Sequence, residues 1–550
     1  MQIRFTLILT TVLVILFLGC NKENMPMIST RTHPIHLDVI NGQAKFVDRR
    51  TGEVFTPRGT NYFNIVDSPF GLQDRFFHAS HFDRQVIRTN IQKLKSYGYN
   101  TIRVFLDTCN DGAGCIGNLN GQGLNIEYMR NVAALMQIAR EEDFFLILTS
   151  NDIPDQGGYS ELSNQGASAL IDGYRNSHYL TTPGVESAEI YWRDIMKTLI
   201  DLDAEFSHVL AWSILNEQWF FNNAPPFSLN SGTVTTANGN TYSLSSQSEK
   251  IRMAEESTDY YISKVAEVIK QYDPDGLVTM GIFSPNTPNL WRSNDFKLSL
   301  ASVTENPDLD FLDLHIYPGT STMDKLMENF QLANPASKPI IMGEVGAFVN
   351  DYNTVDQAQD ALQHWIAMSC AYDFDGWLTW GFFRAPLAIG DATWSLLDEN
   401  ERLLEELSPL KYPDPCNMTW LGDENLALNK SVRVSSELNE EKGAYAVDGD
   451  LTTQWGSGDL PPQWIEIDLG TVTTISRISM VVAQFPEGNT LHIISTKGQQ
   501  GTFTELTQFS QSTDEGDRLE WNGSQSNVRY LRIETTASPS WVSWKEIEVY

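Results

Sequence analysis

Two glutamates each stand directly after an apolar run, at the position where a buried strand would end. The first run closes as Ile214-Leu215-Asn216-Glu217 and the second as Met342-Gly343-Glu344. Two carboxyl groups facing one sugar are what glycosidic cleavage requires, because one protonates the leaving oxygen and the other acts as base or nucleophile. Asn-Glu pairs also occur at 400–401 and 439–440 in other contexts, so the preceding strand-like run is what singles out Glu217 and Glu344.

Polar and aromatic residues also mark the neighbouring apolar runs. One arginine lies within a run, and a histidine, a tyrosine and a tryptophan stand near the ends of two others. Together with the asparagine before the first glutamate, the candidate residues around the pair are Arg103, Asn216, His315, Tyr317 and Trp380.

The elements that must position these residues alternate between strand-like and helical patterns. Eight apolar runs are expected to be buried strands, at 54–61, 101–106, 144–149, 208–215, 277–283, 311–317, 339–344 and 376–381. Helical periodicity falls between most of them, at 83–97, 126–141, 186–202, 249–272, 322–332 and 354–372. Eight strands with intervening helices over roughly 360 residues predict an α/β fold, a (β/α)8 barrel, whose C-terminal strand ends carry the functional residues. A doubly wound sheet is the alternative, but no Gly-rich phosphate loop follows the first run.

Two hairpins are expected beside the barrel. Residues 36–53 contain Asn41-Gly42 and read as a hairpin ahead of the first strand. Residues 218–248 form a long polar insertion after the fourth strand, and Asn238-Gly239 suggests a second hairpin within it.

This constellation resembles glycoside hydrolase family 5 and its wider (β/α)8 clan. The resemblance covers about residues 36–400 and rests on the joint occurrence of Arg58-Gly-Thr-Asn-Tyr62, Asn100-Thr-Ile-Arg-Val104, Leu215-Asn-Glu217, Leu314-His-Ile-Tyr-Pro318, Lys338-Pro-Ile-Ile-Met-Gly-Glu344 and Trp377-Leu-Thr-Trp380. It implies a retaining double displacement with Glu217 as the acid/base and Glu344 as the nucleophile.

The same resemblance implies roles for the surrounding side chains. Asn216 is expected to hold the sugar 2-hydroxyl, Arg103 to orient Glu344 and Tyr317 to hydrogen-bond the nucleophile. His315 is expected near the acid/base, and Trp380 is expected to floor the subsite next to the cleaved bond. Many cellulase-like members carry a His pair after the third strand, whereas this chain has Ser150-Asn151-Asp152 followed by Gly157-Gly158. That stretch is more similar to the β-mannanase branch, and it adds Asn151 to the substrate-binding candidates.

The last 125 or so residues follow another pattern, with short strands, turn signals and no helical periodicity. Segments such as Ala446-Val-Asp-Gly-Asp450, Gln463-Trp-Ile-Glu-Ile-Asp-Leu-Gly470 and Ser543-Trp-Lys-Glu-Ile-Glu-Val549 resemble the discoidin, or coagulation factor 5/8 C-type, domain. In secreted glycosidases this domain occurs as a family 32 carbohydrate-binding module. The resemblance implies an all-β sandwich of about eight strands that binds sugar through loops at one end, with Phe485 and Trp541 as candidates.

A structural Ca²⁺ is a further implication of that resemblance. The matching positions are Asp450, Thr453 and Glu546, whose hard oxygen ligands suit this ion. The alternative is a turn held by hydrogen bonds alone. No cofactor is expected for catalysis, and no Cys/His spacing suggests a zinc site.

The N-terminus predicts export. Residues 5–18 are an apolar run that is too short to span a bilayer and suits a signal peptide. The run ends in Phe17-Leu18-Gly19-Cys20, which resembles a bacterial lipobox in which Cys20 is acylated and becomes the mature N-terminus. An ordinary signal peptide with an incidental cysteine is the alternative. The expected location is the bacterial outer membrane or cell surface, with the membrane contacted only through the lipid anchor.

Two cysteine pairs agree with an exported protein. Cys109 and Cys115 lie close together in a Gly-rich stretch, and Cys370 and Cys416 lie near the end of the barrel segment. Neither pairing follows from the spacing alone.

The expected organisation is a signal peptide over 1–19, a tether over 20–35, a barrel over 36–415, a linker over 416–424 and a sandwich over 425–550. With 38 basic and 70 acidic residues the formal charge is −32, which excludes a basic surface for nucleic acid or anionic lipid. The expected partner is a polysaccharide or oligosaccharide. The sequence predicts a retaining endo-acting β-glycanase on mannan or glucan, with an exo-β-glycosidase and a catalytically dead glycan-binding protein as alternatives.

Overall fold

The computed structural model describes most of the chain beyond the N-terminal segment. The described residues are 33–68, 71–106, 115–283, 296–297, 301–317, 323–330, 332, 338–384, 393–398, 400–416, 425–451 and 453–550. The predicted signal peptide with Cys20, residue Cys109 and most of the predicted linker lie outside them. Among the described helices, none combines the length and the apolar character needed to cross a membrane.

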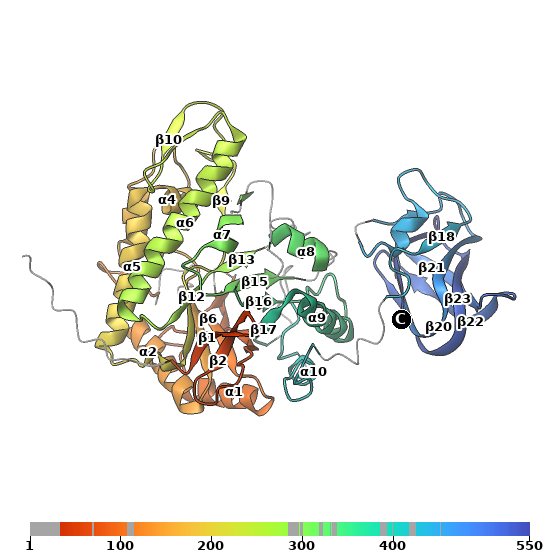
Figure 1. Ribbon diagram of the computed structural model, residues 1–550, viewed down its shortest axis with the longest axis horizontal. Coiled ribbons are helices and arrows are strands. Elements are labelled where there is room, and N and C mark those ends of the chain that lie inside the picture. The colour runs from red at the N-terminus through yellow and green to blue at the C-terminus, as the bar shows by residue number, and fades with distance from the viewer. Residues whose placement is uncertain are drawn as a thin grey trace, which may run out of the picture.

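Eight parallel strand positions close into a barrel, as the sequence predicts (Figure 1). In chain order they are β3 (Arg58–Tyr62), β6 (Thr101–Phe105), β7 (Phe145–Thr149), β8 (Val209–Ser213), β12 (Leu277–Thr279) with β13 (Gly281–Phe283), β15 (Leu312–Ile316), β16 (Ile340–Val345) and β17 (Phe374–Phe382). β12 pairs with β8 and β13 with β15, so these two segments act as one strand interrupted at Met280. β17 pairs with β3 and completes the ring, which confirms the (β/α)8 barrel.

The six predicted helices surround the barrel. They are α1 (Arg84–Ser96), α2 (Ile126–Glu142), α5 (Thr182–Asp201), α6 (Gln247–Tyr272), α8 (Met323–Phe330) and α9 (Val355–Ser369). α1 shows why the pattern predicted them: Ile87, Ile91 and Leu94 form one buried face, and the Asp83 side chain caps the first turn.

Four shorter helices were not predicted. They are α3 (Tyr159–Asn164), α4 (Tyr174–Leu180), α7 (Ala301–Glu305) and α10 (Arg402–Glu406). Segments of five to seven residues span two turns or fewer, which is too short for a periodic apolar face to stand out.

The predicted N-terminal hairpin covers one end of the barrel. β1 (Ile35–Ile40) pairs with β2 (Gln43–Asp48) around Asn41 and Gly42, both at positive φ, as a tight hairpin turn requires. Ile35 and Phe46 pack on residues near the N-terminal strand ends, including Phe145 and Phe311. The C-terminal strand ends are therefore at the other end of the barrel from this hairpin.

The insertion after β8 contains the second predicted hairpin. β10 (Thr233–Thr235) pairs with β11 (Thr241–Ser243) on either side of Asn238-Gly239. The preceding β9 (Phe220–Phe221) pairs with β14 (Phe296–Lys297). This places an aromatic segment directly after Glu217.

The C-terminal region is an antiparallel all-β domain, as predicted (Figure 1, blue). Its described strands are β18 (Ser431–Val434), β19 (Trp455–Gly456), β20 (Gln463–Val482), β21 (Gly488–Lys497), β22 (Thr504–Thr513), β23 (Arg518–Ala537) and β24 (Ser543–Val549). β20 and β23 are each 20 residues long, and their pairing shifts register between Asp468 and Arg477, where long strands can bend. Trp455 and Trp544 are fully buried in the core of this domain.

A disulfide joins Cys370, at the end of α9, to Cys416. This is one of the two pairings left open by the sequence. The other one involves Cys109, which lies outside the described residues.

Candidate active site

Arg103 lies at the centre of a buried polar cluster inside the barrel. Its Nη1 donates to Glu344 Oε1 at 2.8 Å and to Asn61 Oδ1 at 3.0 Å. Its Nη2 donates to Asn216 Oδ1 at 2.7 Å. The guanidinium is fully buried, and its planar fork holds three side chains from different strands in one arrangement.

Glu344 stands in β16 with both carboxylate oxygens occupied. Oε1 accepts from Arg103, and Oε2 accepts from the Tyr317 hydroxyl at 2.6 Å. Burial raises the pKa of Glu344, and the charge of Glu217 acts in the same direction. The charges of His315 and Arg103 and the Tyr317 hydrogen bond lower it in opposition. These contacts fix the carboxylate and support its ionised form.

Glu217 faces Glu344 from the end of β8. Glu217 Oε1 lies 2.8 Å from His315 Nδ1, and the same nitrogen lies 3.4 Å from Glu344 Oε1. One oxygen of each carboxylate and a His315 nitrogen all lie within 4.8 Å of one another. Glu217 is half-buried whereas Glu344 is 2% exposed, so the pair combines an accessible carboxyl group with an enclosed one.

The same three side chains are close enough to hold a metal ion. The Arg103 guanidinium, however, donates to the Glu344 oxygen from 2.8 Å. A fixed positive charge at that distance opposes a second cation. The geometry therefore suits acid–base and nucleophilic chemistry better than metal binding.

Trp380 lies at the end of β17, half-buried and beside the cluster. Its ring meets Phe63 edge-on at a centroid distance of 4.6 Å and Phe105 at 6.0 Å. At Gly346, a Cβ would lie 2.8 Å from the Tyr317 ring and 3.2 Å from Trp380 Cβ. The absence of a side chain at 346 therefore lets Tyr317 and Trp380 approach one another.

Asn151 follows β7 at the same end of the barrel and is half-buried. The next residue, Asp152, pairs with Arg175 at 3.1 Å and with His178 at 3.0 Å. The charges of Arg175 and His178 outweigh burial and lower the pKa of Asp152 to about 2. This ionic group anchors the loop that carries Asn151.

Arg175 was not predicted and supports the backbone of Glu217. Its Nη1 donates to the Glu217 carbonyl at 2.8 Å, and its guanidinium lies 4.4 Å from the centre of the Trp219 ring. Tyr174 and Phe221 contact the Trp219 ring edge-on. Trp219 is half-buried, so it forms an aromatic wall beside Glu217.

Asn61 and Asp313 are two further polar members of the cluster that sequence reasoning missed. Asn61 links Arg103 to the backbone, since its Nδ2 donates to the Gly343 carbonyl at 2.8 Å. Asp313 lies 3.5 Å from Arg103 Nε. The sequence did contain a signal for Asp313. Asp313, His315 and Tyr317 alternate along the predicted strand at 311–317, and alternate residues of a strand share a face.

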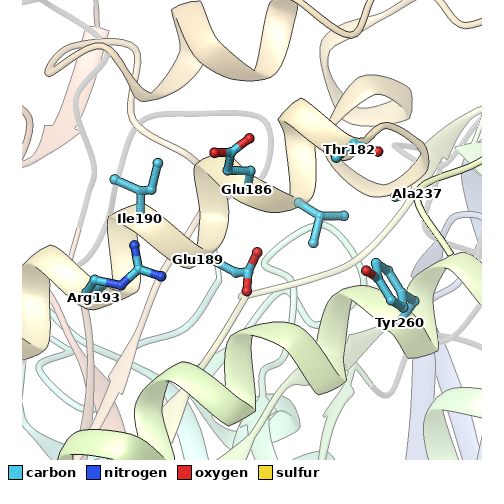
Figure 2. Close-up of a pocket in the computed structure, with 8 residues that line it drawn as sticks. Thr182, Glu186, Glu189, Ile190, Arg193, Ala237 and Tyr260 are labelled. Atoms are coloured by element: carbon cyan, nitrogen blue, oxygen red, sulfur yellow. The ribbon is translucent and has the colours of Figure 1, made fainter. Parts of the chain in front are cut away.

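A separate pocket lies on the outside of the barrel (Figure 2). It has a volume of about 300 Å³ and is lined mainly by α5, including Glu186, Glu189 and Arg193, while α6 contributes Tyr260. Glu189 points into the space between the two helices (Figure 2), and burial raises its pKa. None of the predicted site residues lines this pocket.

The C-terminal candidates gather around the turn at 448–453. Glu546 Oε2 accepts from the Gly449 amide at 3.1 Å, and the Thr453 hydroxyl contacts Asp448 Oδ2 at 2.9 Å and the Asp450 carbonyl at 2.8 Å. Glu546 Oε1 is buried and has no hydrogen-bond partner among the residues that the structure describes. Burial, reinforced by the charge of Glu548, raises the pKa of Glu546 to about 9. An orphaned carboxylate oxygen among oxygen donors fits a hard cation such as Ca²⁺.

Comparison with known proteins confirms the identity of the C-terminal domain. Residues 431–547 match the F5/8 type C domain. A chitosan-binding module from a chitosanase/glucanase of Paenibacillus sp. IK-5 is 27% identical, with a TM-score of 0.20, and covers 23% of this chain and 99% of its own.

Two solved glycosidases align over the larger part of the chain. An endo-1,4-β-mannanase from Rhizomucor miehei is 16% identical with a TM-score of 0.46 and covers 69% of this chain and 100% of its own. An exo-β-1,4-mannosidase from Opitutaceae bacterium strain TAV5 is 15% identical with a TM-score of 0.44 and covers 69% and 63%. Among curated proteins no match is found.

Proposed function

We propose that the barrel is a retaining glycoside hydrolase that cleaves a β-linked polysaccharide of mannan or glucan type. The observation that carries this proposal is the pair Glu217 and Glu344, with carboxylate oxygens less than 4.8 Å apart. Retaining enzymes keep their two carboxyl groups about 5–5.5 Å apart, whereas inverting enzymes need about 6.5–9.5 Å to admit a water molecule. The spacing here supports the retaining geometry.

The two carboxyl groups then divide the reaction into two displacements. In the first, Glu344 attacks the anomeric carbon while Glu217 donates its proton to the leaving oxygen, so the glycosidic bond breaks and a glycosyl ester forms on Glu344. In the second, Glu217 takes a proton from water, the resulting hydroxide attacks the anomeric carbon, and the ester bond breaks. Two inversions give net retention.

The surrounding contacts match the needs of each step. Arg103 and Tyr317 aim the two oxygens of Glu344 before substrate arrives, which lowers the cost of reaching the attack geometry. Because Oδ1 of Asn216 is held by Arg103, its amide nitrogen can serve as the donor to a sugar hydroxyl. Trp380 supplies an aromatic face for the ring next to the cleaved bond.

Incubation with a panel of β-linked polysaccharides tests this proposal directly. We expect new reducing ends from a mannan or a glucan, and proton NMR of the first product should show the β-anomer before mutarotation. Product lengths distinguish the two modes of action, since an endo enzyme releases mixed oligosaccharides and an exo enzyme releases one short product from the start. An α-anomer as the first product would remove Glu344 from the role of nucleophile, and no cleavage of any β-glycan would overturn the proposal.

We further propose that the C-terminal domain holds the protein on its polymeric substrate. Phe485 is 84% exposed and Trp541 52% exposed, and Leu460 is also exposed. The loops that carry them adjoin, because the Val542 amide lies 3.4 Å from the Asp459 carbonyl and a Cβ on Gly488 would lie 2.9 Å from the Pro539 ring. Exposed aromatic rings at one end of a sandwich suit stacking on sugar faces.

Replacing Phe485 and Trp541 with alanine in the full chain should therefore separate binding from catalysis. We expect retention on insoluble polysaccharide to fall about tenfold or more, because the second binding site no longer raises the local substrate concentration. Hydrolysis of a soluble oligosaccharide should stay unchanged. The matched control replaces Val472, an exposed apolar residue elsewhere in the domain. Unchanged retention in a pull-down assay would rule out this end of the sandwich as the sugar site.

We also propose that Asp450, Thr453 and Glu546 hold a structural Ca²⁺. The ion would neutralise the buried Glu546 carboxylate and tie β24 to the turn at 448–453. The residues supply only oxygen donors, in keeping with this ion.

The pH dependence of stability tests the calcium site. Glu546 has a pKa of about 9 in the folded domain against 4.5 ordinarily, so without a cation its contribution to stability is full below pH 4.5 and is lost as the pH rises towards 9. Calorimetry with a chelator should show the melting temperature of the domain falling over that range, and added Ca²⁺ should reverse the fall.

In Glu546→Gln, the melting temperature should no longer fall with rising pH in chelator, and Ca²⁺ should no longer raise it. In Glu440→Gln, at an exposed position of the same domain, both the fall in melting temperature and its reversal by Ca²⁺ should remain. A melting temperature that ignores Ca²⁺ at pH 8 would count against the site.

A further inference from the structure

Asp313 lies in β15 beneath the two glutamates and has no exposed surface. Neither of its carboxylate oxygens has a hydrogen-bond partner among the described residues. Its nearest charged neighbours are Arg103, with Nε at 3.5 Å, and His315, with Nε2 at 3.8 Å. A buried carboxylate without hydrogen bonds is costly unless positive charge compensates it.

Glycines in the two strands beside β15 leave space for the side chains of Asp313 and His315. On one side of β15, a Cβ added to Gly343 of β16 would lie 1.5 Å from Asp313 Oδ1. On the other side, a Cβ added to Gly281 of β13 would lie 1.8 Å from the Asn216 carbonyl oxygen and 2.7 Å from His315 Nε2. A side chain at Gly343 would displace the Asp313 carboxylate, and one at Gly281 would meet the backbone of Asn216 as well as the His315 imidazole, so the space around Asp313 depends chiefly on Gly343.

The charged and titratable groups around Asp313 are one arginine, one histidine and two glutamates. β6 contributes Arg103, β15 itself contributes His315, and β16 contributes Glu344 one residue beyond Gly343. Glu217 follows on the far side of the imidazole, where it contacts Nδ1 at 2.8 Å. Within the described part of the chain, the cluster holds three carboxyl groups and one permanent cation, and His315 is the remaining group there that can supply positive charge.

We propose that Asp313 is a positioning residue that keeps His315 in its imidazolium form, with Nε2–H directed to Asp313 and Nδ1–H donating to Glu217. The inference rests on the proposed hydrolase function only for its catalytic consequence. With Arg103 and His315 positive and Asp313 and Glu344 negative, the cluster is neutral when Glu217 carries its proton. That is the state in which Glu217 can act as an acid.

The net charge of the buried cluster stays at zero when the glycosyl ester forms. When the glycosyl ester forms, Glu344 loses its charge and Glu217 gains one by giving its proton to the leaving group. The imidazolium then faces a Glu217 carboxylate, which is the base needed for the second step. A neutral His315 would leave the buried cluster with one uncompensated negative charge in both states, at a high desolvation cost.

NMR of the ¹⁵N-labelled imidazole rings tests the protonation state without any turnover. The chain has nine histidines, and the His315 signals are those lost in His315→Asn. We expect both ring nitrogens of His315 to be protonated in the wild-type protein at pH about 7, a pH at which a free imidazole is mostly neutral. In Asp313→Asn, which keeps the shape of the side chain, the signals should change to those of a neutral ring.

The kinetic consequence is a change in kcat with little change in KM. We expect kcat of Asp313→Asn to fall about 100-fold, at the lower end of a proton-transfer contribution, and the pH–rate profile to move because the charge beside Glu217 has changed. Asp375→Asn is the matched control, since Asp375 is a partly buried barrel aspartate paired with Lys45 at 2.6 Å. It should leave the His315 signals and kcat unaltered.

The NMR and activity measurements test the Asp313–His315 pairing and the hydrolase function separately. A singly protonated His315 in the wild-type protein at pH about 7 overturns the proposal even if Asp313→Asn does not fold. A doubly protonated His315 that persists in Asp313→Asn also overturns it. Loss of the second proton in a protein that hydrolyses no β-glycan would support the Asp313–His315 pairing and reject the hydrolase function.

Discussion

Replacing Glu344 or Glu217 with alanine is expected to lower kcat by at least about 10³-fold, because each variant loses one half of a two-step reaction. The barrel should still form, since its apolar core is untouched, but Glu344→Ala removes the buried ion-pair partner of Arg103 and should lower the free energy of unfolding. Steady-state rates on a soluble β-glycoside provide the measurement. If either variant keeps more than about a tenth of the wild-type rate, a loss of less than about 1.4 kcal/mol in transition-state stabilisation, the assignment of that residue is wrong.

Reaction with azide distinguishes the nucleophile from the acid/base. In Glu344→Ala a small anion can enter the space of the missing carboxylate and attack the anomeric carbon once, so the glycosyl azide should have inverted configuration. In Glu217→Ala the ester on Glu344 still forms with an activated leaving group, and azide then attacks it to give a retained product. The matched control is Glu401→Ala, since Glu401 also follows an asparagine but stands at the N-cap of α10 and pairs with Lys93. Its rate should match the wild type.

The barrel could be predicted because its strands are short apolar runs that end in polar residues. The strand-end positions of Glu217 and Glu344 also follow from this pattern, since parallel strands in a barrel bring their C-terminal ends to one face. The pattern does not predict the distances between these side chains. That His315 Nδ1 lies between the two carboxylates, 2.8 and 3.4 Å from their oxygens, depends on the tilt and register of β8, β15 and β16.

The residues that were missed are those hidden within a strand or placed on a short helix. Asp313 stands inside the run at 311–317, where apolar neighbours dominate and a single carboxylate is easily taken as part of the strand. Arg175 belongs to α4, a seven-residue helix that gives no clear periodic signal. Its contact with the Glu217 carbonyl joins segments 42 residues apart, and such pairings depend on the packing of the whole chain.

Arg103→Met should produce the second large effect, on stability and activity together. The substitution keeps an apolar stem of similar length but removes the donors that hold Glu344, Asn61 and Asn216. Removing one partner from a buried ionic cluster costs about 3–5 kcal/mol of unfolding free energy, because the remaining charges are left uncompensated. We expect kcat to fall about 100-fold or more as well, since Glu344 is no longer aimed at the anomeric carbon.

Arg103→Lys separates these two effects. A lysine restores the positive charge but not the planar fork that contacts three side chains at once. Denaturant unfolding should therefore show much of the lost stability recovered, while kcat stays low. Arg529→Met, which removes a partly exposed surface ion pair with Asp468 on the C-terminal domain, is the control and should change neither kcat nor stability by a comparable amount. If Arg103→Lys recovered activity along with stability, charge alone would suffice at this position. The geometric role of the guanidinium would then be wrong, and the alignment of Glu344 would depend on Tyr317.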